Sequence, residues 1–185
     1  MDSTRMKRVI GLGVLIAVAA LAGGSSAIAR SGINNQSPDL PSPLCDGLQV
    51  PTGNKLAFRL YAVGVQVYRW NGTSWTFVEP VAQLFGDANY TLKLGTHYAG
   101  PTWESNNGSK VVGRREADCS PDPTAIPWLL LEKVSTAGVG IFTPVTFIQR
   151  VNTKGGLVPT APGTSIGAVA QVPYSTEYYF YYVKP

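Results

Sequence analysis

Residues 55–68 alternate between apolar side chains and a second set of residues with a period of two. Such a period places successive side chains on opposite faces of an extended chain, which is typical of a β-strand. The pair Asn71 and Gly72 follows, a combination favoured in tight turns, and residues 75–78 begin a second apolar run. We therefore predict a β-hairpin in this part of the chain.

Six further runs are rich in aromatic or β-branched residues, are bounded by Gly, Pro or Asn, and predict strands. These runs are residues 90–94, 102–105, 110–116, 128–134, 142–151 and 178–183. Residues 81–85, directly after Pro80, predict a short helix. With 20 glycines and 14 prolines as punctuation, the expected fold is all-β, an antiparallel β-barrel or β-sandwich with at most one or two short helical turns. An α+β domain in which some runs are helical is the alternative.

The first 29 residues have the three parts of a secretory signal peptide. Basic residues precede an apolar stretch at 9–22, and Ala27 and Ala29 are the small residues that a signal peptidase reads. The apolar stretch would span about 21 Å, too short for a bilayer core, so no stable membrane anchor is expected after cleavage. We predict a signal peptide (1–29), a polar linker or N-terminal arm (30–43) and a single β-rich domain (44–185). The expected location is secreted, periplasmic or extracellular.

The chain carries a net charge of +4, but the signal peptide holds three of its 15 Lys and Arg residues and one of its 11 Asp and Glu residues. The remainder is close to neutral and its basic residues are scattered. This distribution gives nucleic-acid binding little electrostatic support. The expected partner is therefore an unknown small molecule, a carbohydrate or an envelope component, and not a nucleic acid.

Cys45 and Cys119 are the two cysteines of the chain. In an oxidising compartment an even number of cysteines predicts a disulfide, and two buried free thiols are the alternative. Four asparagines begin an Asn-x-Ser/Thr sequon, which predicts exposed turns and a possible glycoprotein. These asparagines are Asn35, Asn71, Asn89 and Asn107.

Several familiar catalytic and cofactor motifs do not occur in this sequence. His97 is the single histidine, so a site with several histidine ligands is excluded, and no metal is expected. The chain also lacks a G-x-S-x-G elbow, a P-loop and a dinucleotide-binding glycine fingerprint after a strand. We expect no cofactor, and dehydrogenase activity is not favoured.

Residues 95–113 are the densest polar and aromatic segment. His97 and Glu104 are the catalytic candidates, as a proton-handling pair, while Tyr98 and Trp103 would provide an aromatic wall for a ligand. If residues 102–105 form a strand, Trp103 and Glu104 point to opposite faces. The alternative is structural: a hydrogen-bonded histidine in a loop, a core tryptophan and a solvated glutamate.

Two polar residues lie in otherwise apolar strands and are candidate ligand-binding residues. Gln66, if it points inward, needs a hydrogen-bonding partner, which could be Arg150 or a backbone carbonyl. A structural polar network is the competing interpretation. The aromatic run at 178–182 could stack on a flat ligand or simply fill a barrel.

Six segments occur in an order that resembles a secreted domain-of-unknown-function family, some fungal members of which are labelled malate dehydrogenase. The segments are GVQVY (64–68), HYAGPTW (97–103), GSKV (108–111), IPWLLL (126–131), IQRVNTKGG (148–156) and VPYSTEYYFYY (172–182). The resemblance implies a secreted location and one domain over residues 44–183. It implies no activity, and the chain shows no residue set for hydride transfer.

These observations favour a binding or structural module with a small aromatic-lined pocket. The alternative function is a secreted hydrolase or isomerase that uses His97 as general base and Glu104 as its partner. An envelope protein that acts through its surface is a third hypothesis.

Overall fold

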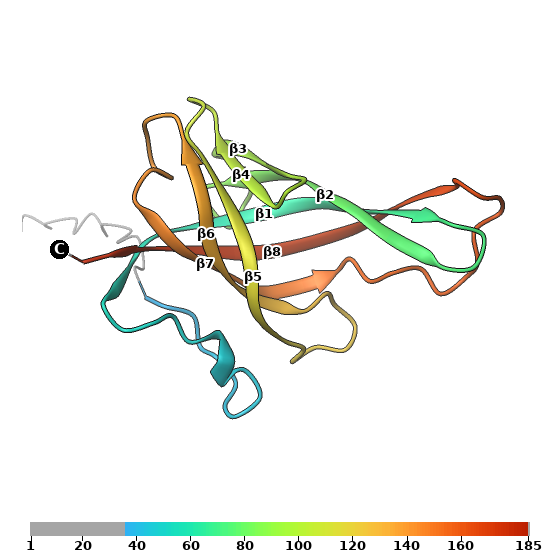
Figure 1. The fold of residues 1–185 in the computed structure, drawn as a ribbon, viewed down its shortest axis with the longest axis horizontal. Helices are drawn as coiled ribbons and strands as arrows, with labels where there is room; N and C mark the ends of the chain where they lie inside the picture. Colours follow the sequence, from blue (N-terminus) through green and yellow to red (C-terminus); the bar gives the residue numbers. More distant parts are fainter. Residues whose placement is uncertain (1–35, 185) are drawn as a thin grey trace, which may run out of the picture. The chain divides into compact units, whose positions relative to one another are not determined.

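The computed structural model describes residues 36–184, which form a closed antiparallel barrel of eight strands in sequence order (Figure 1). The strands are β1 (Asn54–Trp70), β2 (Trp75–Phe85), β3 (Lys93–Tyr98), β4 (Thr102–Ser105), β5 (Lys110–Cys119), β6 (Trp128–Ala137), β7 (Val145–Gly155) and β8 (Val169–Val183). The expected all-β fold is confirmed, and the structure selects the barrel over the sandwich.

The barrel closes where β1 pairs with β8, the first strand with the last. Leu60 lies opposite Tyr178 and Ala62 opposite Thr176 in this long ladder. The predicted hairpin is also confirmed, because β1 pairs with β2 across the turn at Asn71. In Figure 1 the end of β1, the start of β2 and the start of β8 form a ribbon that reaches beyond the other strands.

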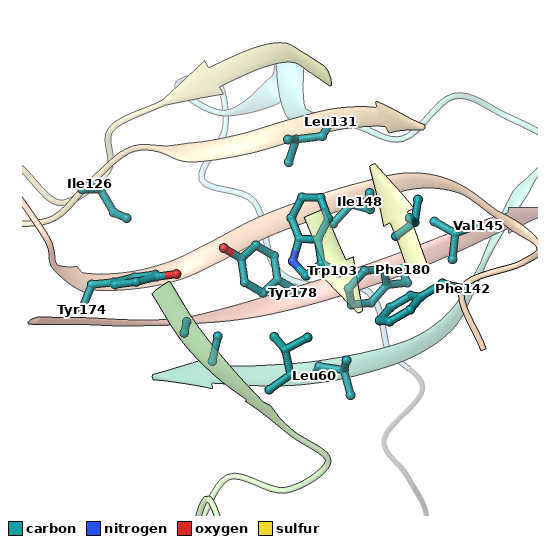
Figure 2. Packing of buried hydrophobic residues seen from close by; sticks show 14 residues of the cluster. Leu60, Trp103, Ile126, Leu131, Phe142, Val145, Ile148, Tyr174, Tyr178 and Phe180 are labelled. Carbon is teal, nitrogen blue, oxygen red and sulfur yellow. The ribbon is translucent and has the colours of Figure 1, made fainter. Parts of the chain in front are cut away.

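The interior of the barrel is filled by aromatic and branched side chains (Figure 2). Trp103 lies at its centre, with the Tyr178 ring 5.2 Å and the Phe180 ring 6.1 Å from it, both in edge-on contact. Alternation along β8 sends Tyr178 and Phe180 inward, because successive side chains of a strand face opposite sides. Tyr178 and Phe180 of the aromatic run therefore lie inside the barrel, whereas Tyr179 and Tyr181 pack in a second cluster on the outer side of the sheet.

A second cluster of buried side chains lies outside the barrel wall, where the segment before β1 covers β5–β8. Cys45 is disulfide-bonded to Cys119, as predicted, and both are buried. The 3-10 turn η1 (Asp46–Leu48) continues this contact, since the Gln149 side-chain amide donates to the Leu48 carbonyl at 2.7 Å. The disulfide and this hydrogen bond fix the segment to the outer face of the sheet.

Two predictions about local structure were wrong. Residues 81–85 are not a helix but the end of β2, with Ala82 and Leu84 buried and Val81 exposed. Pairing with β1 on one side and β3 on the other outweighs the helical preference after Pro80. In the described residues η1 is the one helical element.

The second error concerns residues 90–94, most of which form a loop before β3. The Asp87 carboxylate accepts backbone N–H groups of Asn89, Thr91 and Leu92, and Tyr90 has a positive φ of 57°. Aspartate side chains compete in this way with a strand ladder for the backbone donors. The aromatic and β-branched composition of this run therefore did not decide its structure.

The predicted signal peptide (1–29) lies outside the described residues, and so does Asn35. Of the other sequons, Asn71, Asn89 and Asn107 lie in exposed turns or loops, as expected, and their glycosylation stays a prediction. Within residues 36–184 there is no helix with the length and apolar character needed to cross a membrane.

Candidate functional site

A cavity of about 360 Å³ lies inside the barrel and is lined mainly by apolar and aromatic side chains. Exposed residues, among them Phe77, Val78 and Gly100, border it, so the cavity opens to solvent. Its walls come from β1–β8 and from the turns at 99–101 and 126–127. The lining residues are Gln66, Tyr68, Phe77, Val78, Pro80, His97, Ala99, Gly100, Pro101, Trp103, Arg115, Ile126, Pro127, Leu129, Leu131, Arg150 and Tyr178.

His97 is 3% exposed and contacts two aromatic rings of the cavity wall. Its imidazole stacks on Trp103, with the ring centroids 4.5 Å apart, and meets the edge of Tyr178 at 5.1 Å. Nδ1 lies 2.8 Å from the Thr102 carbonyl oxygen. Because a carbonyl only accepts, Nδ1 carries the proton and Nε2 is the acceptor of the neutral ring.

Burial lowers the pKa of His97 to about 3, although its hydrogen bond to Thr102 acts in the opposite direction. The positive charge of Arg150 lowers this pKa further. Desolvation disfavours the charged form of an imidazole, so the ring stays neutral at neutral pH. His97 is thus a neutral, oriented side chain and a weak base.

Three polar atoms of the lining, Gln66 Nε2, Trp103 Nε1 and the Tyr178 hydroxyl, are buried and make no hydrogen bond of good geometry within the described residues, although the Tyr178 hydroxyl lies near the side chains of Tyr174 and Arg150. Burial also raises the pKa of the Tyr178 phenol, against the positive charge of Arg150, so the hydroxyl keeps its proton. Unpaired buried donors of this kind are uncommon in folded proteins. Their concentration around one cavity marks it as a candidate binding site.

Arg150 supplies the positive charge of the site. Its Nε and Nη2 donate to the Pro127 carbonyl at 3.1 and 2.7 Å, which fixes the guanidinium next to the cavity. Within residues 36–184 Arg150 forms no salt bridge, whereas Arg115, at the rim, pairs with Asp118. No Asp or Glu is among the described residues that line the cavity.

The structure brings four of the predicted site residues together and leaves two outside. Gln66, His97, Trp103 and Arg150 all line the cavity. Tyr98 and Glu104 lie on the outer face of the β3–β4 hairpin instead. There the Tyr98 hydroxyl donates to Glu104 Oε2 at 2.5 Å, and Lys110 Nζ is 3.2 Å from the same oxygen.

The separation of His97 from Glu104 follows from strand register. His97 lies opposite Trp103, and Thr96 lies opposite Glu104. His97 and Glu104 are therefore one residue out of register, and their side chains point to opposite sides of the sheet. The hydrogen bond with Tyr98 and the pairing with Lys110 lower the pKa of Glu104, which stays ionised at the surface. A His97–Glu104 proton-handling pair does not form in this structure.

The family model described as "Protein of unknown function (DUF3455)" matches residues 51–182. The chain belongs to the DUF3455 family. The matched region contains all eight strands apart from Val183, the last residue of β8, and it includes every residue of the cavity lining. Comparisons with curated proteins and with solved structures found no match.

The cavity of the DUF3455 domain is also lined by residues that the sequence analysis did not name individually. Tyr178 is one of several similar aromatics in β8, and only the register shows that it faces the cavity. Ile126 and Leu129 read as ordinary core residues, and no sequence signal distinguishes them. Within residues 36–184 no group of three or more His, Cys, Asp or Glu side chains is placed to hold a metal ion.

Proposed function

We propose that the DUF3455 domain is a binding module that takes a small, largely apolar molecule into its barrel. The observation that carries this proposal is the set of unpaired buried donors, Gln66 Nε2, Trp103 Nε1 and the Tyr178 hydroxyl, around an open apolar cavity. A buried donor without a partner costs about 1–3 kcal/mol. A ligand with suitable acceptor atoms would offset that cost.

The size of the cavity supports this proposal. A volume of about 360 Å³ falls at the lower end of the range found for small-molecule sites. Eight-stranded barrels are wide enough either to be filled by side chains or to hold one small ligand. In this barrel the Phe142 end of the interior is packed, and the Gln66 end is hollow.

We further propose that this module works outside the cytoplasm. The disulfide between Cys45 and Cys119 supports an oxidising compartment, because such bonds are rare where thiols are kept reduced. The basic and apolar N-terminal residues of the sequence agree with export.

The enzyme alternative gains no support from the site. His97 and Glu104 face opposite sides of the wall, and a pKa of about 3 makes His97 a poor general base at neutral pH. The malate dehydrogenase label of some fungal proteins is likewise not part of this proposal, because the chain has no dinucleotide fingerprint.

A calorimetric titration tests the binding proposal. The probes are naphthalene derivatives with one polar group: a hydroxyl, a carboxylate, a carboxamide or an aminomethyl group. We expect saturable one-to-one binding of at least one probe and a ligand-dependent rise in Tm. Absence of saturable binding for all four probes would overturn the proposal.

Cavity-filling variants locate the binding. Leu129→Trp and Ile126→Phe each place a larger side chain in the cavity, from two different parts of its wall. Each variant should therefore weaken binding at least tenfold. Val134→Trp, on the exposed part of the same strand as Leu129, is the matched control and should bind normally. Unchanged affinity in both cavity variants, with folding confirmed by circular dichroism, would place the probes elsewhere.

A further inference from the structure

We infer that the buried part of the cavity recognises a carboxylate, so that the ligand is a small apolar or aromatic carboxylic acid. This inference rests on the proposed binding function and goes beyond it by naming the ligand class. Three features of the lining support it: the chemistry of its unpaired atoms, its charge, and the position of that charge in the wall.

The unpaired atoms of the lining are all able to donate. The Trp103 indole N–H and the Gln66 amide nitrogen donate only, and the Tyr178 hydroxyl can donate as well as accept. An ionised carboxylate is an acceptor at both oxygens and can satisfy several such donors at once. The imidazole Nε2 of His97 is an acceptor, so it could bind one donor group at another position on the ligand.

The charge of the lining is positive and uncompensated. His97 is neutral, Arg115 is paired with Asp118, and Arg150 has no carboxylate partner within residues 36–184. Its influence reaches the cavity, because the positive charge of Arg150 acts on the pKa values of both His97 and Tyr178. A partly buried guanidinium beside neutral donors favours an anion over a neutral group.

The position of Arg150 is set by the sheet. Leu129, Arg150 and Tyr178 lie directly opposite one another on β6, β7 and β8, so they form one row across the inner wall. The guanidinium is anchored on the Pro127 carbonyl through Nε and Nη2, and it lies near enough to the Tyr178 hydroxyl to act on its pKa, so Arg150 and Tyr178 together would present donors to a ligand. The neighbouring apolar residues, such as Ile126 and Phe77, would contact the body of the acid.

The test compares 2-naphthoate with 2-naphthamide and 2-(aminomethyl)naphthalene by calorimetry at pH 7. These probes share one ring system, and they present an anion, a neutral amide and a cation. We expect naphthoate to bind at least tenfold more tightly than the amide, and the cation to bind most weakly. If the amide or the cation binds as tightly as naphthoate, the carboxylate inference is overturned while the binding function stands. If none of these three binds and the hydroxyl derivative does not bind either, the binding function itself fails.

Substitutions in the cavity wall identify the residue that gives the preference for a carboxylate. Arg150→Gln should abolish the preference for naphthoate over the amide, whereas Arg115→Gln, at the rim, should preserve it. Tyr178→Phe removes an unpaired hydroxyl and should fold at least as well as the wild type, yet bind naphthoate three- to tenfold more weakly. A full preference for naphthoate in both Arg150→Gln and Tyr178→Phe would contradict the assignment. If Arg150→Gln fails to fold, Tyr178→Phe decides the question: an affinity for naphthoate equal to that of the wild type in this variant would contradict the assignment.

Discussion

At the residue scale, the interior of this barrel combines a neutral histidine with donors that have no partner within residues 36–184. His97 is held by the Thr102 carbonyl and stacked on Trp103, so its ring is fixed in both plane and tautomer. Trp103 and Gln66 keep unpaired N–H groups nearby. Such an arrangement is costly for folding alone, and this cost is the basis of the proposed binding function.

The buried histidine predicts a specific pH dependence of stability. The pKa of His97 is about 3 in the folded state and about 6.5 when unfolded, so between these values the unfolded chain binds the proton more strongly. The free energy of unfolding should therefore fall as the pH drops from 6.5 towards 3. Within this window we expect the free energy of unfolding of the wild type to fall by about 1.4 kcal/mol per pH unit more than that of His97→Phe. The reason is that the unfolded wild type binds about one more proton than the folded wild type.

Urea unfolding of both proteins at pH 7, 6, 5 and 4 measures this difference. The carboxylates titrate equally in both proteins, so they cancel in the comparison. Parallel stability curves for the wild type and His97→Phe would show that the histidine is not held neutral by burial.

A glycine in β1 predicts a large local effect. A Cβ on Gly64 would lie 2.1 Å from the Val81 carbonyl oxygen and 2.5 Å from the Ala82 Cα, both atoms of the neighbouring strand. Gly64→Ala should therefore force β1 and β2 apart and cost about 3 kcal/mol or more. In Gly47→Ala, the control, the nearest atom is 3.9 Å from the new Cβ, and stability should change little. Equal stability of the two variants in urea would contradict this close approach.

At the element scale, the β3–β4 hairpin separates residues that are adjacent in the sequence. His97 and Trp103 face the cavity, while Tyr98 and Glu104 face solvent with Lys110. The period of two predicted that Trp103 and Glu104 have opposite facing, but not which of them faces inward. That choice depends on how the hairpin pairs with the adjoining strands β2 and β5, which the alternation within the hairpin does not encode.

Because Glu104 points to solvent and Gln66 points into the cavity, substitutions at these two positions should affect ligand binding unequally. Glu104→Gln should leave the affinity for 2-naphthoate within twofold of the wild type, because the side chain lies outside the cavity. Gln66→Leu removes a donor inside the cavity and should lower that affinity at least fivefold. The same loss in both variants, measured by calorimetry, would be inconsistent with the two positions.

The segment before β1 is a separate element that covers the outer wall. Its disulfide closes a loop between residues 74 positions apart, which stabilises the fold by roughly 4 to 5 kcal/mol in the chain-entropy description. Replacing Cys45 and Cys119 together by alanine should lower the free energy of unfolding by about this amount and make residues 36–50 sensitive to proteases. Probe binding should persist in folded protein, because the disulfide is outside the cavity. A double variant as stable as the wild type would rule out this role.

At the scale of the whole domain, closure of the barrel was the part of the fold that the sequence left open. Alternation and turn residues predicted most strands, but the same pattern fits a sandwich, since both architectures bury one face of each strand. Closure depends on the pairing of β1 with β8, at opposite ends of the domain. Four site residues were predictable as polar or aromatic residues in apolar strands, whereas Tyr178 was hidden among similar aromatics until the register of β8 was known.

The central claim is that the unpaired donors inside the barrel bind a ligand, and the indole N–H signals of the four tryptophans test it most directly. In a ¹H–¹⁵N spectrum titrated with 2-naphthoate, the Trp103 signal should shift downfield and saturate as its N–H gains an acceptor. The Trp75 signal, whose N–H already donates to the Ala161 carbonyl at 2.8 Å, should stay in place. A Trp103 signal that does not move while naphthoate binds, or that moves no more than the Trp75 signal, would contradict the account.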